Sequence, residues 1–481
     1  MNALDSQLNS PRGRAFQSFS NRLVADTAEG AQLRACLDDP NSFDLGEGQH
    51  FYECLHEAVA ETTSSNHNDK RLFADYLAWS GRVKQALPEV ADLCRAYTKN
   101  KKNISRKRLN LANTLHLNPQ SDKTREHAEQ IFEKMKTIVL DEETLQQSAY
   151  PPKDFWMVES EAIRHRWERH LDERIPADSR RKEKPVMMVD PEKLNHDLGP
   201  EESAMFVNKQ GELQFLVLRD FCGSKEVREW CDIVIRQHVD VKRNVRKEDP
   251  GSVVLTGFSA GARSARSFGW VRNLVRKHGV TSTLEQDGCS ANAIFWNMAR
   301  GILGNHPKAS QIIADTENFI MKEDLYRNDR QAWEGGRGGQ YWADVGDGEP
   351  ILFNNAELAP PSGAFAVNYT RCVHTERQPH KFVLSWTTSR DGSIERGGHF
   401  YNCRLRTRVQ AARNTLVVHI PEEEHGTSLQ DVDPKDPEPE EVNQAGMSIF
   451  TSSALPGVFR KFINGLITCE EAQEMAFADV E

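Results

Sequence analysis

Residues 366–429 constrain the fold most, because they combine strand-like apolar runs with a pattern of metal-binding side chains. His374 and Glu376 lie two residues apart at the end of one such run. Residues two apart in a β-strand point to the same face, so this imidazole and this carboxylate can bind one metal ion. His425 follows a second apolar run, residues 414–420, and is the candidate third ligand. Two histidines and one carboxylate, with the other coordination positions open, are typical of a non-haem Fe(II) oxygenase.

The His-x-Glu pattern is short, and several copies are expected by chance in a chain with 16 His and 71 acidic residues. His238 and Asp240 also fit a His-x-acid pattern, but residues 227–238 have helical periodicity. Their side chains are therefore expected to diverge. The strand-like surroundings of residues 374–376 favour a metal site there instead.

Length and composition indicate a globular protein with more than one domain. A chain of 481 residues is long enough for two or three domains and a sizeable core. No apolar run approaches the ~18 residues of a membrane span, and the N-terminus has no signal-peptide apolar core. The nine cysteines include no Cys-x-x-Cys pair, which argues against a structural zinc site and a secreted disulfide scaffold. We therefore expect an intracellular protein with no membrane partner.

The formal net charge of -10 is unevenly distributed along the chain. Acidic residues concentrate in residues 431–441, and basic residues concentrate in residues 99–108 and 180–184. Local clusters, more than the total charge, set the field that a phosphate backbone feels. Either the basic clusters are solvated linkers and helix ends, or they serve nuclear import or nucleic-acid binding. The acidic segment is rich in proline and is expected to be an exposed, flexible insertion.

The periodicity of apolar residues divides the chain into three parts. Residues 1–200 are predicted to be a helical N-terminal region with basic linker segments, in which residues 185–200 form a mixed linker. Residues 201–465 are predicted to form a β-rich domain, and residues 466–481 a C-terminal tail. The fold class is therefore α+β.

Within the β-rich part, a hairpin is predicted at residues 204–218, with its turn at 209–211. A helix is predicted to begin at Ser224 and to continue through His238. Further helices are predicted near residues 267–278 and 307–330.

Gly257-Phe-Ser259-Ala-Gly261 offers a different function. A Gly-x-Ser-x-Gly turn between a strand and a helix exposes the nucleophile of α/β-hydrolases. That fold also needs parallel strands upstream, whereas the upstream half of this chain has helical periodicity. A serine hydrolase using Ser259 therefore remains an alternative, and it requires a histidine beside this serine.

Arginines near the glycine-rich segments are candidates for contact with nucleic acid. Arg263 and Arg266 are interleaved with Phe268 and Trp270, and bases can stack on such aromatic rings. Arg337 lies in a glycine-rich segment that can form a groove-probing hairpin. A solvent-facing helix and a mobile loop explain the same residues, and both interpretations stay open.

The C-terminal half resembles fungal members of the TET/JBP group of Fe(II)- and 2-oxoglutarate-dependent nucleic-acid oxygenases. The resemblance is carried by Asn368, the His374-Thr-Glu376 step, and residues 414–418, 425–429, 446–453 and 264–269. It implies a double-stranded β-helix, or jelly roll, in residues 201–465. It also implies Fe(II), 2-oxoglutarate and O₂ as reactants, and oxidation of a methylated base such as 5-methylcytosine.

The resemblance further implies that the partner is nucleic acid, with DNA preferred over RNA, and that the location is nuclear. Such enzymes flip the target base out of the duplex, because its methyl group cannot reach the metal inside the stack. Asn368 is expected near this base, and Arg263, Arg266 and Arg337 are expected to bind substrate.

Two departures from the family pattern concern the site itself. The family usually has aspartate at the position of Glu376, whose longer side chain still ligates but shifts the metal. The family also has an arginine on the strand after the distal histidine, which pairs with the far carboxylate of 2-oxoglutarate. Here Arg371, Arg408 and Arg460 are the candidates for that role. The missing arginine makes a non-catalytic nucleic-acid-associated relative that keeps the fold the first alternative, ahead of the serine hydrolase.

Overall fold

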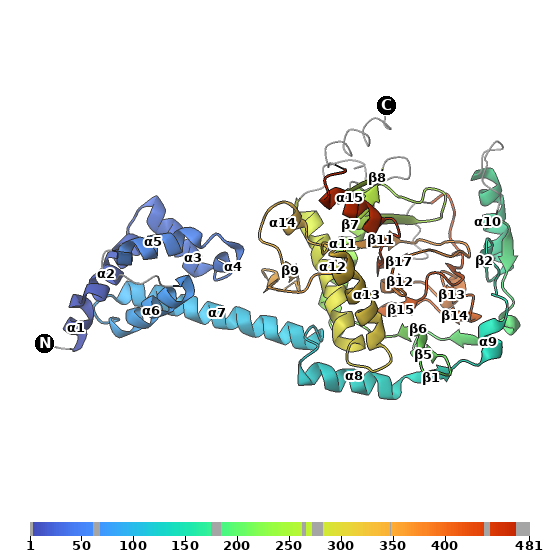
Figure 1. The fold of residues 1–481 in the computed structure, drawn as a ribbon, viewed down its shortest axis with the longest axis horizontal. Coiled ribbons are helices and arrows are strands. Elements are labelled where there is room, and N and C mark those ends of the chain that lie inside the picture. Colours follow the sequence, from blue (N-terminus) through green and yellow to red (C-terminus); the bar gives the residue numbers. More distant parts are fainter. Residues whose placement is uncertain are drawn as a thin grey trace, which may run out of the picture. The chain divides into compact units, whose positions relative to one another are not determined.

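The N-terminal part of the chain is helical, as predicted from its periodicity (Figure 1). In this computed structural model, residues 3–60, 68–174, 184–261, 266–271, 282–346, 348–436 and 443–467 are described. The chain divides into two compact units, Met1–Leu111 and Ala112–Glu481. Residues 112–200, which the sequence groups with the helical region, therefore belong to the second unit. No helix among the described residues is long and apolar enough to cross a membrane.

Helices of the first unit enclose an aromatic core. The helices are α1 (Ala3–Asn9), α2 (Pro11–Val24), α3 (Ala28–Asp38), α4 (Ser42–Leu45), α5 (Gln49–Ala60), α6 (Asp69–Arg82) and the first part of α7 (Pro88–Thr114). Ser10, Thr27 and Asn68 cap α2, α3 and α6, since each side chain accepts a hydrogen bond from a backbone N–H of the first turn. Phe51 and Tyr76 are fully buried within the core that these helices share.

The second unit is built on a nine-stranded sheet. Its strands, in spatial order, are β1 (Lys136–Val139), β5 (Ala204–Val207), β6 (Leu213–Leu218), β15 (Thr415–His419), β12 (Val383–Asp391), β17 (Asn443–Ile449), β11 (Ser362–Val367), β7 (Ser252–Gly261) and β8 (Arg266–Trp270). The pair of β1 and β5 is parallel, and the remaining pairs are antiparallel.

A smaller, four-stranded sheet is formed by β16 (His425–Thr427), β13 (Phe400–Asn402), β14 (Thr407–Val409) and β4 (His196–Leu198). Two further pairs are β2 (Trp156–Val158) with β3 (Val186–Met188), and β9 (Gln340–Ala343) with β10 (Ile351–Asn354). Short 3₁₀ turns lie at Pro191–Lys193 and Ile394–Arg396.

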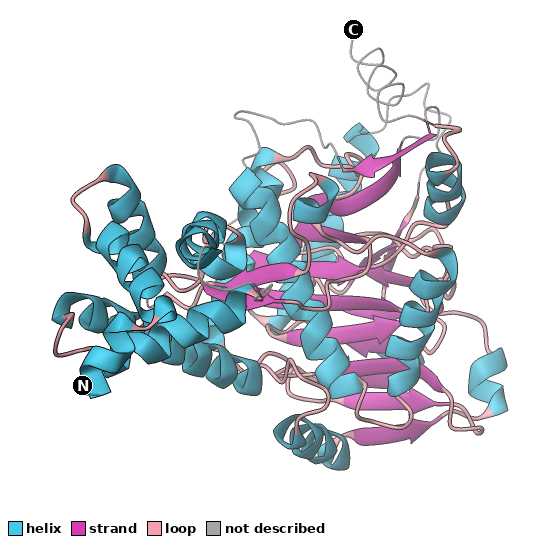
Figure 2. Cartoon of the chain, turned by 60° about the vertical axis from the view of Figure 1, so that its left-hand side comes forward, coloured by secondary structure: helices cyan, strands magenta, loops and turns pink. Residues whose placement is uncertain are grey.

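Helices cover one face of the nine-stranded sheet (Figure 2). The helices of this unit are α8 (Asp122–Lys134), α9 (Glu142–Gln146), α10 (Glu161–Arg174), α11 (Lys225–Val241), α12 (Ser282–Leu303), α13 (Ser310–Glu323), α14 (Arg330–Trp333) and α15 (Leu455–Ile463). Helix α11 contacts β11, β12 and β17. On β17, Ala445, Met447 and Ile449 are buried, whereas Gln444, Gly446 and Ser448 are half-buried. The period-two pattern thus separates a fully buried face from a half-buried face, and residues 444–448 of this strand line a cavity.

Several elements follow the sequence predictions. The hairpin of β5 and β6 has its turn at the predicted place, with Gly211 in the left-handed conformation that the turn requires. Helix α11 begins after Ser224, whose side chain accepts a hydrogen bond from the N–H of Val227. His238 lies on this helix, so it does not share a face with Asp240, as expected.

Other predictions are wrong. Residues 266–270, within the predicted helix at 267–278, form strand β8, in which Phe268 and Trp270 are buried on alternate positions. Residues 272–281 lie outside the described residues. The predicted linker at 185–200 contains β3 and β4, which pair with strands distant in sequence. The predicted helix at 307–330 comprises α13 and then, after a break, the start of α14.

The acidic segment 431–441 is not exposed throughout. Oδ1 of Asp431 lies 3.3 Å from Nε of Arg166, and Oδ2 lies 3.7 Å from Nη1 of Arg396. Val432 is buried. Residues 437–442 lie outside the described residues, as do residues 468–481 of the predicted tail. The start of the segment therefore packs against α10 and the 3₁₀ turn before β13.

Candidate metal centre

His374 and His425 face each other across an isolated antiparallel bridge. The N–H of His374 donates to the carbonyl of His425 at 2.9 Å, and the reverse bond is 3.0 Å. The centroids of the two imidazole rings are 4.3 Å apart. Backbone pairing thus brings together two residues that are about fifty positions apart in the sequence.

The hydrogen bonds of the two imidazoles fix which ring nitrogen is available. Nδ1 of His374 donates to the carbonyl of Cys372 at 2.8 Å, and Nδ1 of His425 donates to that of Glu423 at 2.9 Å. Because carbonyls only accept, both Nδ1 atoms carry the proton. The lone pair of each ring therefore lies on Nε2, which is the state of a histidine ready to bind a metal.

Glu376 completes the group. One ligand atom from each of His374, Glu376 and His425 lies within 4.8 Å of the others, and Oε1 of Glu376 is 3.7 Å from Nε2 of His374. Glu376 does not lie in a strand, contrary to the alternation expected from the sequence, because only His374 forms a bridge. The carboxylate reaches the site from a loop whose N–H, at Glu376, donates to the carbonyl of Pro421 at 2.7 Å.

Arginines balance the carboxylate charge at the site. Arg371 forms an ion pair with Glu376, and Nη2 of Arg246 lies 3.9 Å from the same Oε1 atom. Nε of Arg371 is also 3.7 Å from Asp249, which accepts a hydrogen bond of 2.7 Å from the hydroxyl of Tyr369. Desolvation opposes the charge of Arg371, but the neighbouring Glu376 and the other acidic groups raise its pKa overall.

Burial keeps the imidazoles of the site neutral. Desolvation lowers the pKa of His374, and the neighbouring His425 and Arg371 lower it further. Burial also lowers the pKa of His425. A neutral imidazole is the form that binds a metal. Burial of the two histidines therefore favours the protonation state that metal binding requires.

His419 is a residue of the site that the sequence analysis missed. It is buried at the end of β15, and its ring centroid is 4.5 Å from that of His425. Its Nδ1 is buried without a hydrogen-bond partner among the described residues. Its only sequence signal is its position two residues after Val417, at the end of an apolar run.

The three candidate ligands line a cavity of about 1440 Å³ over the free face of the large sheet. The floor carries small or neutral side chains, which leave room for a ligand: Leu255, Ala364, Ser385, Val417, Gly446 and Ser448. The lining also contains Arg243, Arg246, Arg330, Phe268, Trp270 and Trp333. The cavity therefore joins a metal-binding group to cations and aromatic rings.

The candidate co-substrate arginines lie in different surroundings. Arg371 lines the cavity. Arg408 instead binds Asp197 at 2.9 Å and Glu159 at 3.0 Å, and Arg460 pairs with Glu323 on α13. Neither Arg408 nor Arg460 is among the cavity-lining residues.

Arg219 is a cavity-lining arginine that the sequence analysis did not single out. It is buried, and it donates to the hydroxyl of Thr415 at 2.9 Å and to the carbonyls of Glu202, Gly199 and Gln410. None of these acceptors is charged, and burial lowers the pKa of Arg219 to about 10. No family pattern pointed to it, because it lies at the end of β6, far in sequence from the histidines.

Three of the four candidate substrate-binding residues, Asn368, Arg266 and Arg337, lie in the described part of the chain. Asn368 adopts φ 50°, and its Oδ1 accepts a hydrogen bond of 2.7 Å from the N–H of Gln444 on β17. Arg266 is exposed on β8, and Arg337 is exposed in the loop after α14. Arg263 lies outside the described residues.

The geometry required for a serine hydrolase does not form. Ser259 lies inside strand β7 and not at a turn between a strand and a helix. The flanking strands β8 and β11 pair with β7 in antiparallel fashion. The hydroxyl of Ser259 accepts a hydrogen bond of 3.0 Å from the N–H of Gly261. The nucleophile-turn interpretation of residues 257–261 is therefore wrong.

Comparisons with known proteins give a distant likeness. No family model matches the chain, and no curated protein matches it. One solved structure that it matches is NgTET1 in complex with 5mC DNA, at 11% identity and a TM-score of 0.34. That alignment covers 65% of this chain and 87% of the other. The interpretation of the site therefore depends on its own geometry.

Proposed function

We propose that this protein is an Fe(II)- and 2-oxoglutarate-dependent dioxygenase that oxidises a methylated base in nucleic acid. The observation that carries the proposal is the group of His374, Glu376 and His425, with both Nε2 atoms free, at the wall of a large cavity. Two imidazoles and one carboxylate, with further positions open, suit Fe(II).

The order of the strands supports a double-stranded β-helix. Starting from β11, successive segments alternate between the large sheet and the small one: β11, the bridge at His374, β12, β13 with β14, β15, β16 and β17. The chain thus winds between two sheets, as in a jelly roll. In this arrangement the bridge and β16 carry His374 and His425 at the small sheet, and the loop after the bridge carries Glu376.

The residues present fit a bound iron. The imidazoles are held by backbone carbonyls on their outer nitrogens, which fixes their orientation. When bound, iron supplies the oxidising chemistry, in which a methyl group, 2-oxoglutarate and O₂ become a hydroxymethyl group, succinate and CO₂. The protein holds the ligands, orients the co-substrate and limits the access of water.

Arg371 is the best-placed of the three candidate arginines for the co-substrate. It lines the cavity beside the ligands, whereas Arg408 and Arg460 pair with carboxylates outside the cavity lining. A metal that draws Glu376 into its coordination shell would free the guanidinium for a carboxylate of 2-oxoglutarate. Arg219 provides a further positive charge on the cavity wall.

The lining of the cavity suits a nucleic-acid substrate. Arg243 and Arg246 supply charges for phosphates, and the half-buried Trp333 supplies a ring for stacking, whereas Phe268 and Trp270 are buried in a hydrophobic core cluster. A cavity of about 1440 Å³ has room for a base flipped from the duplex together with the co-substrate. We propose DNA as the first substrate to test and a nuclear location, in keeping with the basic residues 99–108.

A specific observation favours the non-catalytic alternative. Arg371 is already paired with Glu376, and β17 carries no arginine at all. If Arg371 kept this partner, the carboxylate would be a poor metal ligand. In that case the protein would bind nucleic acid and keep the fold but would not catalyse oxidation.

The deciding experiment measures succinate and hydroxymethylated base after Fe(II), 2-oxoglutarate and methylated DNA or RNA are added to the purified protein. We expect both products in equal amounts from one of these substrates. His425→Ala should abolish both, because two ligands hold iron poorly. Circular dichroism of this variant serves as the folding control. Folded, iron-loaded protein that releases no succinate with any substrate would support the non-catalytic alternative.

A further inference from the structure

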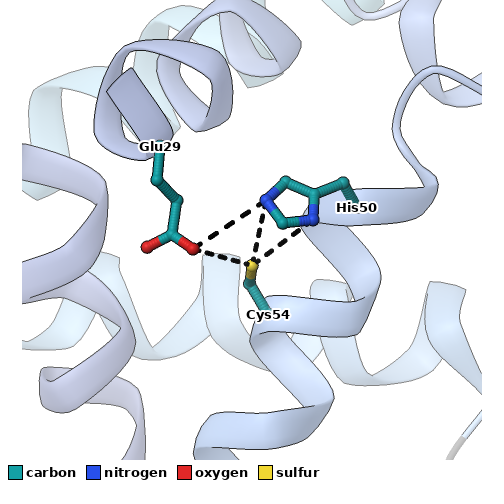
Figure 3. A group of neighbouring side chains, drawn as sticks. All are labelled: Glu29, His50 and Cys54. Carbon is teal, nitrogen blue, oxygen red and sulfur yellow. Dashed lines mark hydrogen bonds and ion pairs between the residues drawn. The ribbon is translucent and has the colours of Figure 1, made fainter. Parts of the chain in front are cut away.

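A second group of metal-binding side chains lies in the first unit, among Glu29, His50 and Cys54 (Figure 3). Glu29 lies in the first turn of α3, and His50 and Cys54 lie on α5. Residues four apart on a helix share a face, so the imidazole and the thiol point toward the same carboxylate. Cys54 is buried, while Glu29 and His50 are partly exposed.

The distances among the three donors approach those of a tetrahedral zinc site. Sγ of Cys54 is 3.5 Å from Nε2 of His50 and 3.8 Å from Oε1 of Glu29, and the nitrogen and oxygen are 3.9 Å apart. Zinc binds sulfur at about 2.3 Å and nitrogen or oxygen at about 2.0–2.2 Å, so tetrahedral neighbours are separated by roughly 3.3–3.6 Å. Shifts of a few tenths of an ångström would close the three atoms around an ion.

A cation already occupies the space beside these donors. Nη2 of Arg22 donates to Oε1 of Glu29 at 2.8 Å and to Sγ of Cys54 at 3.1 Å. Nη1 of the same guanidinium donates to Glu57 at 3.0 Å, and Nε donates to the second oxygen of Glu29 at 3.1 Å. Arg22 can therefore release Oε1 and the sulfur while it keeps two carboxylate contacts.

Charge balance also favours a divalent ion. Glu29, Glu53 and Glu57 carry three negative charges, and Arg22 carries one positive charge, which leaves two negative charges uncompensated. Binding of a divalent ion forms a metal–sulfur bond and releases the thiol proton to solvent, which reduces the net charge of the cluster from −2 to −1. Burial raises the pKa of the Cys54 thiol, and a bound metal ion would favour the thiolate instead.

We propose that Glu29, His50 and Cys54 form a zinc site that ties the first turn of α3 to α5, with water as the fourth ligand. Thiolate, imidazole and carboxylate together form a donor set that zinc uses. The site is independent of the proposed dioxygenase function, because none of its residues belongs to the second unit.

Cobalt(II) distinguishes this site from the candidate iron centre. A thiolate bound to Co(II) gives a charge-transfer absorption in the near ultraviolet, and the group of His374, Glu376 and His425 contains no sulfur. The 481-residue protein with His425→Ala would be reduced, freed of metal with a chelator and titrated with Co(II). We expect one equivalent to produce the thiolate band, and Zn(II) to remove it by displacement.

Three variants make the test specific. Cys54→Ser should abolish the band, whereas Cys36→Ser, at a buried cysteine outside the cluster, should retain it. His50→Gln changes a side chain that is 40% exposed, so it should fold, and it should weaken Co(II) binding at least ~10-fold. A band that survives Cys54→Ser, an affinity unchanged by His50→Gln, or no thiolate band in the parent protein would overturn the proposal.

Discussion

At the scale of single residues, the centre combines ligands whose states are set by their neighbours. The backbone carbonyls of Cys372 and Glu423 choose the tautomers of the two histidines, and Arg371 compensates the charge of Glu376. The same guanidinium therefore serves two carboxylates in succession under the proposed function. It holds the protein ligand before the metal binds and holds the co-substrate afterwards.

Replacement of Arg371 by glutamine tests this double role. We expect the Kd of 2-oxoglutarate for the iron-loaded protein, measured without O₂, to rise about 10- to 100-fold. A lost hydrogen bond to a charged group is worth about 1.5–3 kcal/mol. Arg246→Gln is the matched control, since this arginine is 46% exposed and 3.9 Å from Glu376. Equal effects of the two variants would contradict a specific role of Arg371.

At the scale of elements, helices α11 and α12 pack closely against each other behind the large sheet. Gly288 on α12 faces His238 on α11, and a Cβ at position 288 would lie 2.6 Å from Nε2 of that histidine. This nitrogen donates to the carbonyl of Leu284 at 2.9 Å. The absence of a side chain at Gly288 is therefore what allows α11 and α12 to approach.

Gly288→Ala is expected to lower the free energy of unfolding by about 1–3 kcal/mol, because the added methyl group must displace a buried, hydrogen-bonded ring. Gly457→Ala on α15 is the control, since no atom would lie within 4 Å of its Cβ. That variant should be neutral or stabilising by up to about 1 kcal/mol, as alanine favours helix. Urea denaturation measures both, and a stable Gly288→Ala protein would show that the helices can separate.

The same histidine gives a pH dependence. Desolvation, and then the charge of Lys242, lowers the pKa of His238 from 6.5 to about 3, while the buried Glu285 opposes this shift. Between these pH values the unfolded chain binds more protons, so stability falls as the pH drops below about 6.5. His238→Gln should reduce that slope by up to about 1.4 kcal/mol per pH unit. Denaturation midpoints at pH 4.5–7 measure it, and parallel curves for both proteins would refute this assignment.

Local patterns explain which elements the sequence could predict. The hairpin at 204–218 and the capped helix from Ser224 follow from turn and capping chemistry within a few residues. Strands β3 and β4 could not be predicted, because their partners β2 and β14 lie far away in the sequence. The candidate ligands were found by their spacing, whereas His419 and Arg219 reach the cavity through sheet pairing alone. Spacing is visible in a sequence, but long-range pairing is not.

At the scale of the whole molecule, an acidic chain carries one strongly basic helix. Between Asp92 and Asp122 the sequence contains no acidic residue, and helix α7 spans most of this stretch. Lys99, Lys102 and Arg106 are exposed on one face of α7 at spacings of three and four residues. A cationic stripe of this kind suits a phosphate backbone, so the first unit would contribute affinity while the cavity of the second unit contributes chemistry.

Replacing these three cations by glutamine should therefore weaken the binding of methylated DNA without changing the turnover number at saturating DNA. Each lost phosphate contact should reduce the slope of log K against log salt concentration by about 0.9, because fewer counterions are released. The control replaces Lys70, Lys225 and Lys322 by glutamine. These lysines are exposed on three separate helices, and their replacement removes the same total charge. Fluorescence anisotropy at several salt concentrations would give both slopes. Identical slopes for the two triple variants would mean that net charge, and not helix α7, attracts the nucleic acid.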